Sequence, residues 1–465
     1  MKKILSSCTI LLIIFLYCNL DNSNVLAQEN SNNYTIVLKQ KEDLEQVAKQ
    51  IKGDNVNIEY SIPEIGVFQV KIAPNQLNDI KSNHLIDTYS KSMKVFNSDE
   101  NFENNYLKEE NSTFWDSQWD MKKVTNNGES YKLFQGTKKV TVGIIDTGLD
   151  INHSDLKANI VSGSKNLVPK GGFNGEEVDE TGDINQLTDF IGHGTYTAGQ
   201  IAGNGKIKGV APGIGIRSYR VFGNLDSEAI WTAKAIVEAA KDNVDVINLS
   251  LGGYLVNGTI YSSDGKSKQD LADIKSLKKA INFAKKRGSI VVAAAGNDAL
   301  DVADKKKMSS YFNDQLKASG ISFEGKILDV PAELSNVVTV ASTGPTDELS
   351  LFSNYGNGFI DIAAPGGDNR LLEKFGFEEW LDRGYMEKEE VLSTTPNEGY
   401  SYAAGTSVST PKVSGALALI IDKNHFKDKP NKALNFLYKN GVTQGRTDKE
   451  FFGHGILDVN NALMH

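Results

Sequence analysis

Cysteine is nearly absent from this sequence. Its 465 residues contain only two, Cys8 and Cys18, and both lie close to the N-terminus. If that segment is removed, the remaining chain can form no disulfide bond and has no thiolate for catalysis or metal binding. A chain of this length does not need such cross-links, because it can bury a large hydrophobic core.

An excess of basic residues is also missing. The chain has 50 lysines and arginines against 59 aspartates and glutamates, which gives a net charge of −9. There is no positive surplus to neutralise phosphates, so nucleic acid is excluded as the main partner, whereas a cationic peptide is not.

Long apolar runs are confined to the N-terminus. Lys2 and Lys3 precede the apolar segment Thr9–Cys18, and small residues follow at 25–27. This order is typical of a secretory signal peptide, here residues 1–27, because the segment is too short to span a bilayer. An uncleaved anchor is the alternative. We expect a secreted, extracellular protein without a stable membrane anchor.

Residues 28–96 have the pattern of a small, self-contained α+β unit. A polar stretch rich in Asn and Glu, residues 97–112, follows with the composition of a linker. The predicted elements are a strand at Tyr34–Leu38, a helix at Leu44–Ile51, a strand at Val67–Ile72, a helix at Asn75–Ser82 and a strand at Tyr89–Val95.

From residue 113 to 465, apolar strand-like runs alternate with helical segments. Such alternation predicts an α/β domain with a mostly parallel sheet and helices on both faces. The predicted strands are Val140–Ile145, Val244–Leu249, Ile290–Ala295 and Val337–Val340, and the predicted helices include Thr197–Ala202 and Ala229–Lys241.

Three reactive side chains lie at strand ends or glycine turns. Asp146 follows the first strand of this domain, and His193 stands between two glycines at the head of a helix. Ser407 follows Gly-Thr near an expected helix N-terminus, with Pro411 suited to the first turn of that helix. Together they form an acyl-transfer set: His193 takes the serine proton and Asp146 orients the imidazole.

Asn297 fits the same chemistry. It follows the strand Ile290–Ala295 and Gly296, where its amide can donate a hydrogen bond to an oxyanion. One such donor contributes about 3–4 kcal/mol of transition-state stabilisation. The backbone N–H of Ser407 would be the second donor. Taken one at a time, these four residues could equally be turn, cap or packing residues.

The order Asp, His, Ser, within the motifs IIDTG, GHGT, AAAGN and GTSVSTP, resembles the subtilisin-like serine proteases. The resemblance implies a serine endopeptidase with a three-layer subtilisin-like fold and no cofactor for catalysis. It also implies that residues 28–96 are a ferredoxin-like propeptide, which acts as chaperone and inhibitor and is cut off autocatalytically within 97–112. An independent binding domain is the alternative for this unit.

Two positions depart from the family pattern. Thr197 replaces a usual aliphatic residue after the histidine, and Lys412 replaces a common histidine after the proline. We expect neither side chain to touch a reacting group.

The resemblance also implies where a substrate peptide lies. Two segments, Phe222–Leu225 and Ser250–Gly253, would hold it as an added β-strand, and its P1 side chain would enter a pocket. The predicted substrate-binding residues are Ser250, Leu251, Gly252, Gly253, Ala294, Ala295, Gly296 and Asp329.

Asp329 is expected at the floor of the P1 pocket, where an anion would select Arg or Lys. A solvated loop acid is the alternative. Acidic residues in the loop after Leu156 would attract basic peptides as a rim of the cleft, unless they only form a solvated surface. These residues are Glu176, Glu177, Asp179, Glu180 and Asp183.

This combination resembles the secreted peptidases that remove the leader peptide from lantibiotic precursors after arginine. A lantibiotic precursor is therefore the expected substrate and partner. A broad-specificity degradative subtilisin is the alternative enzyme. A catalytically dead binding protein would need a lost triad residue, and none is lost.

Calcium is a doubtful structural cofactor. Gln118 and Asp155 match two ligands of a calcium site found in the family. Calcium needs six to eight oxygens, and the loop Gly203–Gly209 that should supply most of them is short. We therefore expect a degenerate site.

Overall fold

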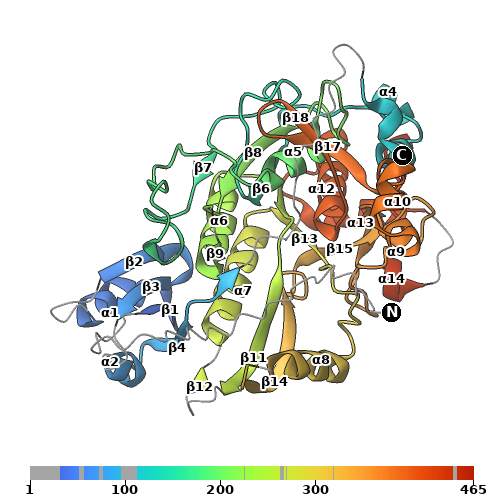
Figure 1. The fold of residues 1–465 in the computed structure, drawn as a ribbon. Coiled ribbons are helices and arrows are strands. Elements are labelled where there is room, and N and C mark those ends of the chain that lie inside the picture. The colour runs from blue at the N-terminus through green and yellow to red at the C-terminus, as the bar shows by residue number, and fades with distance from the viewer. Residues whose placement is uncertain are drawn as a thin grey trace, which may run out of the picture.

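The computed structural model describes residues 32–51, 57–72, 77–95, 113–224, 226–261, 267–268, 270–317, 319–443 and 448–465. The predicted signal peptide and linker lie outside these ranges. Within them, no helix is both long and apolar enough to cross a membrane. The described chain forms an N-terminal unit, residues 32–95, and a larger body, residues 113–465 (Figure 1).

The N-terminal unit is a four-stranded antiparallel sheet with two helices, as the pattern of residues 28–96 predicted. The strand order is β2-β3-β1-β4, and its core includes Ile36, Phe68 and Val70. Strand β2 was not predicted. The elements are β1 (Asn32–Leu38), α1 (Leu44–Ile51), β2 (Asn57–Ile62), β3 (Val67–Ile72), α2 (Leu77–Ser82) and β4 (Ile86–Lys91), with 3₁₀ turns at Lys41–Asp43 and Pro63–Ile65.

The larger body is built on a seven-stranded sheet of order β16-β15-β13-β10-β6-β8-β7. All its described pairings are parallel, as predicted from the alternation of strands and helices. The strands are β6 (Thr141–Asp146), β7 (Lys165–Asn166), β8 (Gly215–Arg220), β10 (Val246–Leu249), β13 (Ile290–Ala294), β15 (Val337–Thr343) and β16 (Ile362–Pro365).

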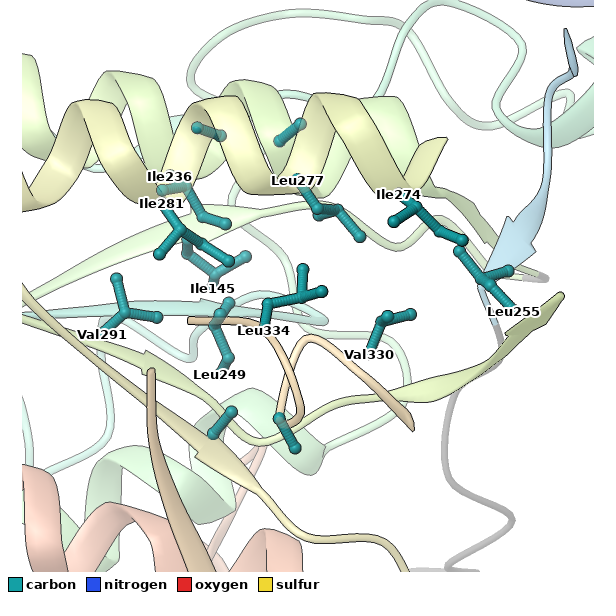
Figure 2. Close-up of a cluster of buried hydrophobic side chains, with 14 of the residues drawn as sticks. Ile145, Ile236, Leu249, Leu255, Ile274, Leu277, Ile281, Val291, Val330 and Leu334 are labelled. Carbon is teal, nitrogen blue, oxygen red and sulfur yellow. The ribbon is translucent and has the colours of Figure 1, made fainter. Parts of the chain in front are cut away.

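Helices cover both faces of this sheet and complete a three-layer α/β fold (Figure 1). In β6, Val142 and Ile144 pack toward α5 and α12, whereas Ile145 packs toward α6 and α7. Figure 2 shows the face of the sheet covered by α6 and α7, where Ile236, Leu277 and other helix residues pack against the strands. The helices are α3 (Trp119–Val124), α4 (Glu129–Leu133), α5 (His193–Ala202), α6 (Ala229–Lys241), α7 (Leu271–Lys286), α8 (Lys305–Lys317), α9 (Arg370–Phe375), α10 (Phe377–Asp382), α11 (Met386–Glu389), α12 (Thr406–Lys423), α13 (Pro430–Asn440), α14 (Lys449–Phe452) and α15 (Val459–Met464), with 3₁₀ turns at Trp115–Ser117 and Phe173–Gly175.

A long antiparallel ribbon projects beside the main sheet. Strands β11 (Gly253–Tyr261) and β14 (Ser322–Val330) pair along their full lengths, with β12 (Ser267–Lys268) at one edge. Helix α8 packs on the ribbon, and the ring of Phe312 lies 4.7 Å from that of Tyr254. A separate hairpin joins β17 (Val391–Thr395) to β18 (Gly399–Ala403).

The N-terminal unit packs against α6 and α7 (Figure 1). Lys279 of α7 donates from Nζ to the carbonyl of Leu38 at 2.8 Å. Strand β5 (Lys94–Val95) then pairs with β9 (Ser227–Glu228) of the larger body. The unit therefore shares a continuous, specific interface with that body.

Candidate active site

Asp146 and His193 meet in a buried hydrogen bond. Asp146 is the last residue of β6 and His193 the first of α5, and their Oδ1 and Nδ1 atoms lie 2.7 Å apart. Both side chains are at least 96% buried. Because Nδ1 faces the carboxylate, Nε2 is the ring nitrogen that can accept a proton from a nucleophile such as a serine hydroxyl.

Asp189 determines where α5 begins. Its carboxylate accepts hydrogen bonds from the N–H groups of Gly192 and Thr195 at 2.7 and 2.8 Å, and from the Thr147 hydroxyl at 2.8 Å. It thereby pairs the N–H groups of Gly192, the residue before the helix, and of Thr195 in its first turn, and links both to Thr147, the residue after Asp146. The helix starts at His193, four residues earlier than predicted.

Two glycines let these segments approach backbone to backbone. A Cβ atom on Gly194 would lie 2.1 Å from the carbonyl oxygen of Gly148, and Gly148 has a φ of +134°. A side chain at either position would push the histidine away from the aspartate. This close approach explains the glycines in both motifs.

Ser407 is the second residue of α12, as predicted, and α12 packs against α5. Pro411, however, lies inside the helix rather than in its first turn. Having no N–H, it leaves the carbonyl of Ser407 without its intrahelical donor. The hydroxyl of Ser250 donates to that carbonyl at 2.8 Å. Ser250, a predicted substrate-binding residue, is thus bonded directly to the predicted nucleophile.

Asn297 is held with its carbonyl toward α12. Its Oδ1 accepts from the N–H and the hydroxyl of Thr406, at 2.9 and 2.8 Å. This orientation turns the amide N–H groups of Asn297 away from Thr406, the residue before Ser407. An amide fixed in this way is suited to donating to a developing oxyanion, because it does not have to reorient during the reaction.

The Asp329 side chain lies close to two predicted substrate-binding glycines, Gly252 and Gly296. A Cβ on Gly296 would lie 3.1 Å from its Oδ2, and one on Gly252 would lie 3.8 Å from its Oδ1. Asp329 is the second-last residue of β14 and is only 2% exposed. The alternative of a solvated loop acid is therefore wrong.

Burial raises the pKa of Asp329 well above its ordinary value, and nearby Asp298 and Glu333 add to the effect. The hydrogen bond with Asn354 and the charge of Lys305 lower the pKa of Asp329 and partly offset this rise. Burial also raises the pKa of Asp298, to about 6. A buried carboxyl group of this kind gains most from a cationic partner, which would favour its ionised form.

Comparison with known proteins identifies the family. The protein-family profile of the subtilases (Peptidase_S8) matches residues 137–455 of this chain. This chain is a subtilase. It is a serine endopeptidase with the subtilisin-like fold predicted from its motifs.

Two relatives are described as leader peptide-processing serine proteases. The epidermin protease EpiP of Staphylococcus epidermidis is 44% identical over 89% of this chain and 90% of its own. The nisin protease NisP of Lactococcus lactis is 43% identical over 75% of this chain, which spans about half of NisP. The crystal structure of EpiP from Staphylococcus aureus superposes with a TM-score of 0.83, at 42% identity over 93% of this chain and 98% of that one.

The proposed calcium ligands of this subtilase are already engaged by backbone groups. Both carboxylate oxygens of Asp155 accept N–H bonds from Lys206 and Ile207 at 3.0 Å. The Gln118 amide accepts from the N–H of Lys208 and donates to its carbonyl. The described residues contain no group of three or more His, Cys, Asp or Glu suited to a metal. Gln118 and Asp155 do not fit a calcium site here, because the short loop closes on them directly.

The predicted acidic rim is only partly a surface feature. Glu177 is buried and accepts from the N–H groups of Phe173 and Asn224, at 2.8 and 2.5 Å. Glu180 is buried in an ion pair with Arg220 at 2.6 Å. Only the remaining three acids, Glu176, Asp179 and Asp183, are exposed.

The two expected substrate-binding segments are mostly irregular, although Gly253 is the first residue of β11. Residues 222–224 form irregular backbone, with Leu225 outside the described residues, and β10 ends just before Ser250. The N–H of Asn224 donates to the carboxylate of Glu177, so the acidic loop holds residues 222–224 in place.

One expectation about the departures from the family pattern was wrong. The Thr197 hydroxyl donates to Oδ2 of Asp146 at 3.3 Å, so Thr197 does touch a residue of the predicted triad. Lys412 forms a fully buried ion pair with Asp120 of α3 at 3.0 Å.

An Asp three residues before a Gly-His-Gly turn was a signal that could have revealed Asp189 in the sequence. No local pattern marked Asn354 or Tyr254, although Asn354 bonds Asp298, Tyr254 and Asp329.

Proposed function

We propose that this subtilase is a secreted leader peptidase that cuts a lantibiotic precursor after a basic P1 residue. The observation that carries the proposal is the buried carboxyl group of Asp329 between Gly252 and Gly296. The similarity to EpiP and NisP supports the same substrate class. A guanidinium group entering this pocket would replace lost hydration by a bidentate ion pair.

The proposed reaction uses the residues described above. Ser407 attacks the scissile carbonyl while His193 removes its proton, and Asp146 stabilises the resulting imidazolium. Asn297 and the N–H of Ser407 bind the tetrahedral oxyanion. His193 then donates the proton to the leaving amine. Water, activated by His193, hydrolyses the acyl-enzyme ester, which releases the carboxylic acid product and restores the Ser407 hydroxyl. No metal is needed for any of these steps.

We further propose that residues 28–96 are the propeptide, released by a cut within 97–112. Its support is the interface with α6 and α7 and the pairing of β5 with β9. A large parallel sheet depends on distant contacts and folds slowly, which gives a docked helper unit a physical role.

The test uses the full chain expressed in a Gram-positive host with its N-terminal segment intact. Secreted enzyme should label with a fluorophosphonate, and the S407A variant should not. Peptides that differ only at P1 should be cut much faster with Arg than with Phe, and a lanthionine-containing precursor should lose its leader at a basic residue. Equal cleavage of both peptides would instead favour the degradative subtilisin.

A further inference from the structure

Asn354 occupies a buried position between the two halves of the proposed site. It lies in the loop between β15 and β16, and its side chain is 0% exposed. It belongs to none of the catalytic motifs. Its contacts nevertheless reach both the loop that carries Asn297 and the floor of the P1 pocket.

On one side, Asn354 brackets Asn297. Its own N–H donates to the carbonyl of Gly296 at 2.9 Å. Its Oδ1 accepts from the N–H groups of Asp298 and Leu300, at 3.1 and 3.0 Å. The backbone is thus held directly before and directly after the proposed oxyanion donor. A loop with several fixed points has little freedom to move that donor away from its place.

On the other side, Asn354 holds the pocket floor. Its Nδ2 donates to Oδ2 of Asp329 at 3.1 Å and to the hydroxyl of Tyr254 at 2.6 Å. Tyr254 faces Asp329 directly across the β11–β14 ribbon. The Tyr254 hydroxyl in turn donates to Asp298 at 2.5 Å.

These contacts use both amide protons and both lone pairs of the oxygen, which is the full capacity of an asparagine side chain. The opposite amide orientation would place a carbonyl oxygen against the Asp329 carboxylate and N–H groups against two backbone donors. The network therefore has one stable arrangement, and a change at Asp329 alters the hydrogen bonds that hold the loop of Asn297, and the reverse.

We propose that Asn354, assisted by Tyr254, is a positioning residue that couples recognition of a P1 cation at Asp329 to placement of the oxyanion donor Asn297. The inference rests on the proposed function, since it requires an anionic pocket floor. A P1 guanidinium that pairs with Asp329 would meet a carboxylate already oriented by the amide that also holds the catalytic loop.

The experiment separates the two sides of the amide with two substitutions in the full-length protein after maturation. N354A removes every side-chain contact, and we expect at least a tenfold loss of kcat on both the Arg and the Phe peptide. N354D keeps oxygen acceptors for the loop but replaces the donor beside Asp329 with an acid. It should retain more kcat than N354A on the Phe peptide.

The pH profile is the readout that a purely structural role would not move. Ionised Asp329 is required to bind the P1 cation, and it is faced by Asp298, Glu333, Lys305 and Tyr254. In N354D a second acid adds negative charge and a donor is lost, so the Asp329 pKa rises. The acid limb of kcat/KM should move at least one pH unit higher for the Arg peptide, with no comparable move for the Phe peptide.

Two further variants keep the test decisive. Y254F leaves the Asn354–Asp329 bond in place, so its acid limb for the Arg peptide should lie between those of the parent and N354D. If N354D folds poorly, the shift of Y254F from the parent on the Arg peptide, without one on the Phe peptide, is the reading. N159D makes the same chemical change at another buried asparagine, one that bonds Ala202 and Pro212. It should lower Tm without a P1-dependent shift.

The outcomes distinguish the inference from the function beneath it. If the parent enzyme shows no preference for Arg, the anionic pocket itself is wrong. If the parent prefers Arg but N354D leaves the Arg profile unmoved, or N159D moves it equally, the coupling role of Asn354 is overturned.

Discussion

The carboxylate of Asp146 receives hydrogen bonds from three neighbours. His193 and the N–H of Thr147 bind Oδ1, and the hydroxyl of Thr197 binds Oδ2 at 3.3 Å. Each donor spreads the negative charge that would otherwise stabilise the imidazolium of His193. The carboxylate that faces His193 is therefore also held by a threonine that the sequence motifs alone did not implicate.

Replacing Thr197 by valine tests this dependence with little change of volume. Without the hydroxyl, Asp146 loses a hydrogen-bond donor and directs more of its charge to the bond with His193, which favours the protonated imidazole. The acid limb of kcat/KM should move to higher pH, with a loss of about three- to tenfold below the optimum. T197S, which keeps the hydroxyl, is the control and should retain the parental profile. An unchanged profile in T197V would remove Thr197 from the catalytic group.

The proposed charge of the P1 pocket is tested by D329G. Removing a buried ion-pair partner typically costs about 2–5 kcal/mol, so the preference for Arg over Phe should fall at least about 30-fold. D382N neutralises an exposed carboxyl on α10 instead and should leave the preference intact. Arginine selectivity that survives D329G would show that another residue forms the floor.

The pocket should also respond to pH in the parent enzyme. The Asp329 pKa is raised by burial, so the carboxyl is protonated at low pH and cannot pair with a cation. It ionises as the pH rises, and kcat/KM for an Arg peptide should rise more steeply with pH than for a Phe peptide. Parallel profiles for the two peptides would contradict an ionisable floor.

At the scale of elements, local patterns predicted the segments that carry Asp146, His193 and Ser407, but not the contacts that surround them. The run before Asp146 and the glycines around His193 are signals within a few residues. Asn354 bonds Tyr254, which is 100 positions away, and no local pattern encodes such a pair. The β11–β14 ribbon was missed for the same reason, because its partner strands are separated by a long connection.

The early start of α5 shows a different limit. Glycines on both sides of His193 are poor helix formers, so intrinsic propensity placed the start at Thr197. The carboxylate of Asp189 overrides that propensity by accepting the N–H bonds of the first turn. Pro411 was likewise placed one turn too early, because its tolerance inside α12 depends on Ser250 satisfying the Ser407 carbonyl.

The loop Gly203–Gly209 predicts calcium independence. Backbone N–H groups of Lys206 and Ile207 already occupy both oxygens of Asp155. Neither EGTA nor millimolar Ca²⁺ should therefore change the Tm of the matured enzyme by more than about 1 °C, measured by calorimetry. D155A, which leaves those N–H groups unpaired, should lower the Tm by several degrees (about 2–4 °C per kcal/mol for a large domain). Marked stabilisation by calcium would mean that the loop opens to bind it.

At the scale of the whole molecule, the interface with the N-terminal unit encloses acidic groups. Gln69 and Asn33 of the unit donate to Glu228, and the N–H of Met93 donates to Asp273 at 3.1 Å. Burial is the leading cause of a raised pKa for both Glu228 and Asp273. The assembled state therefore binds protons more tightly than the separated parts.

This linkage predicts that the unit dissociates more readily as the pH rises. Protonated carboxyls favour the complex at low pH, and that contribution is lost as the pH passes through the raised pKa values of Glu228 and Asp273. Inhibition of mature enzyme by added residues 28–96 should weaken toward alkaline pH, and D273N should flatten the trend. Tighter inhibition at alkaline pH would contradict it.

The ion pair between Asp120 and Lys412 constrains how the enzyme can be activated. Lys412 belongs to the helix that begins beside Ser407, and its partner stands only six residues beyond Phe114, whose N–H is anchored to Lys206. A maturation cut on the C-terminal side of Asp120 would remove that carboxylate and leave the buried ammonium group of Lys412 without its counter-ion. The cut proposed within 97–112 avoids this, because it lies upstream of Asp120 and leaves the Asp120–Lys412 ion pair intact in the processed enzyme.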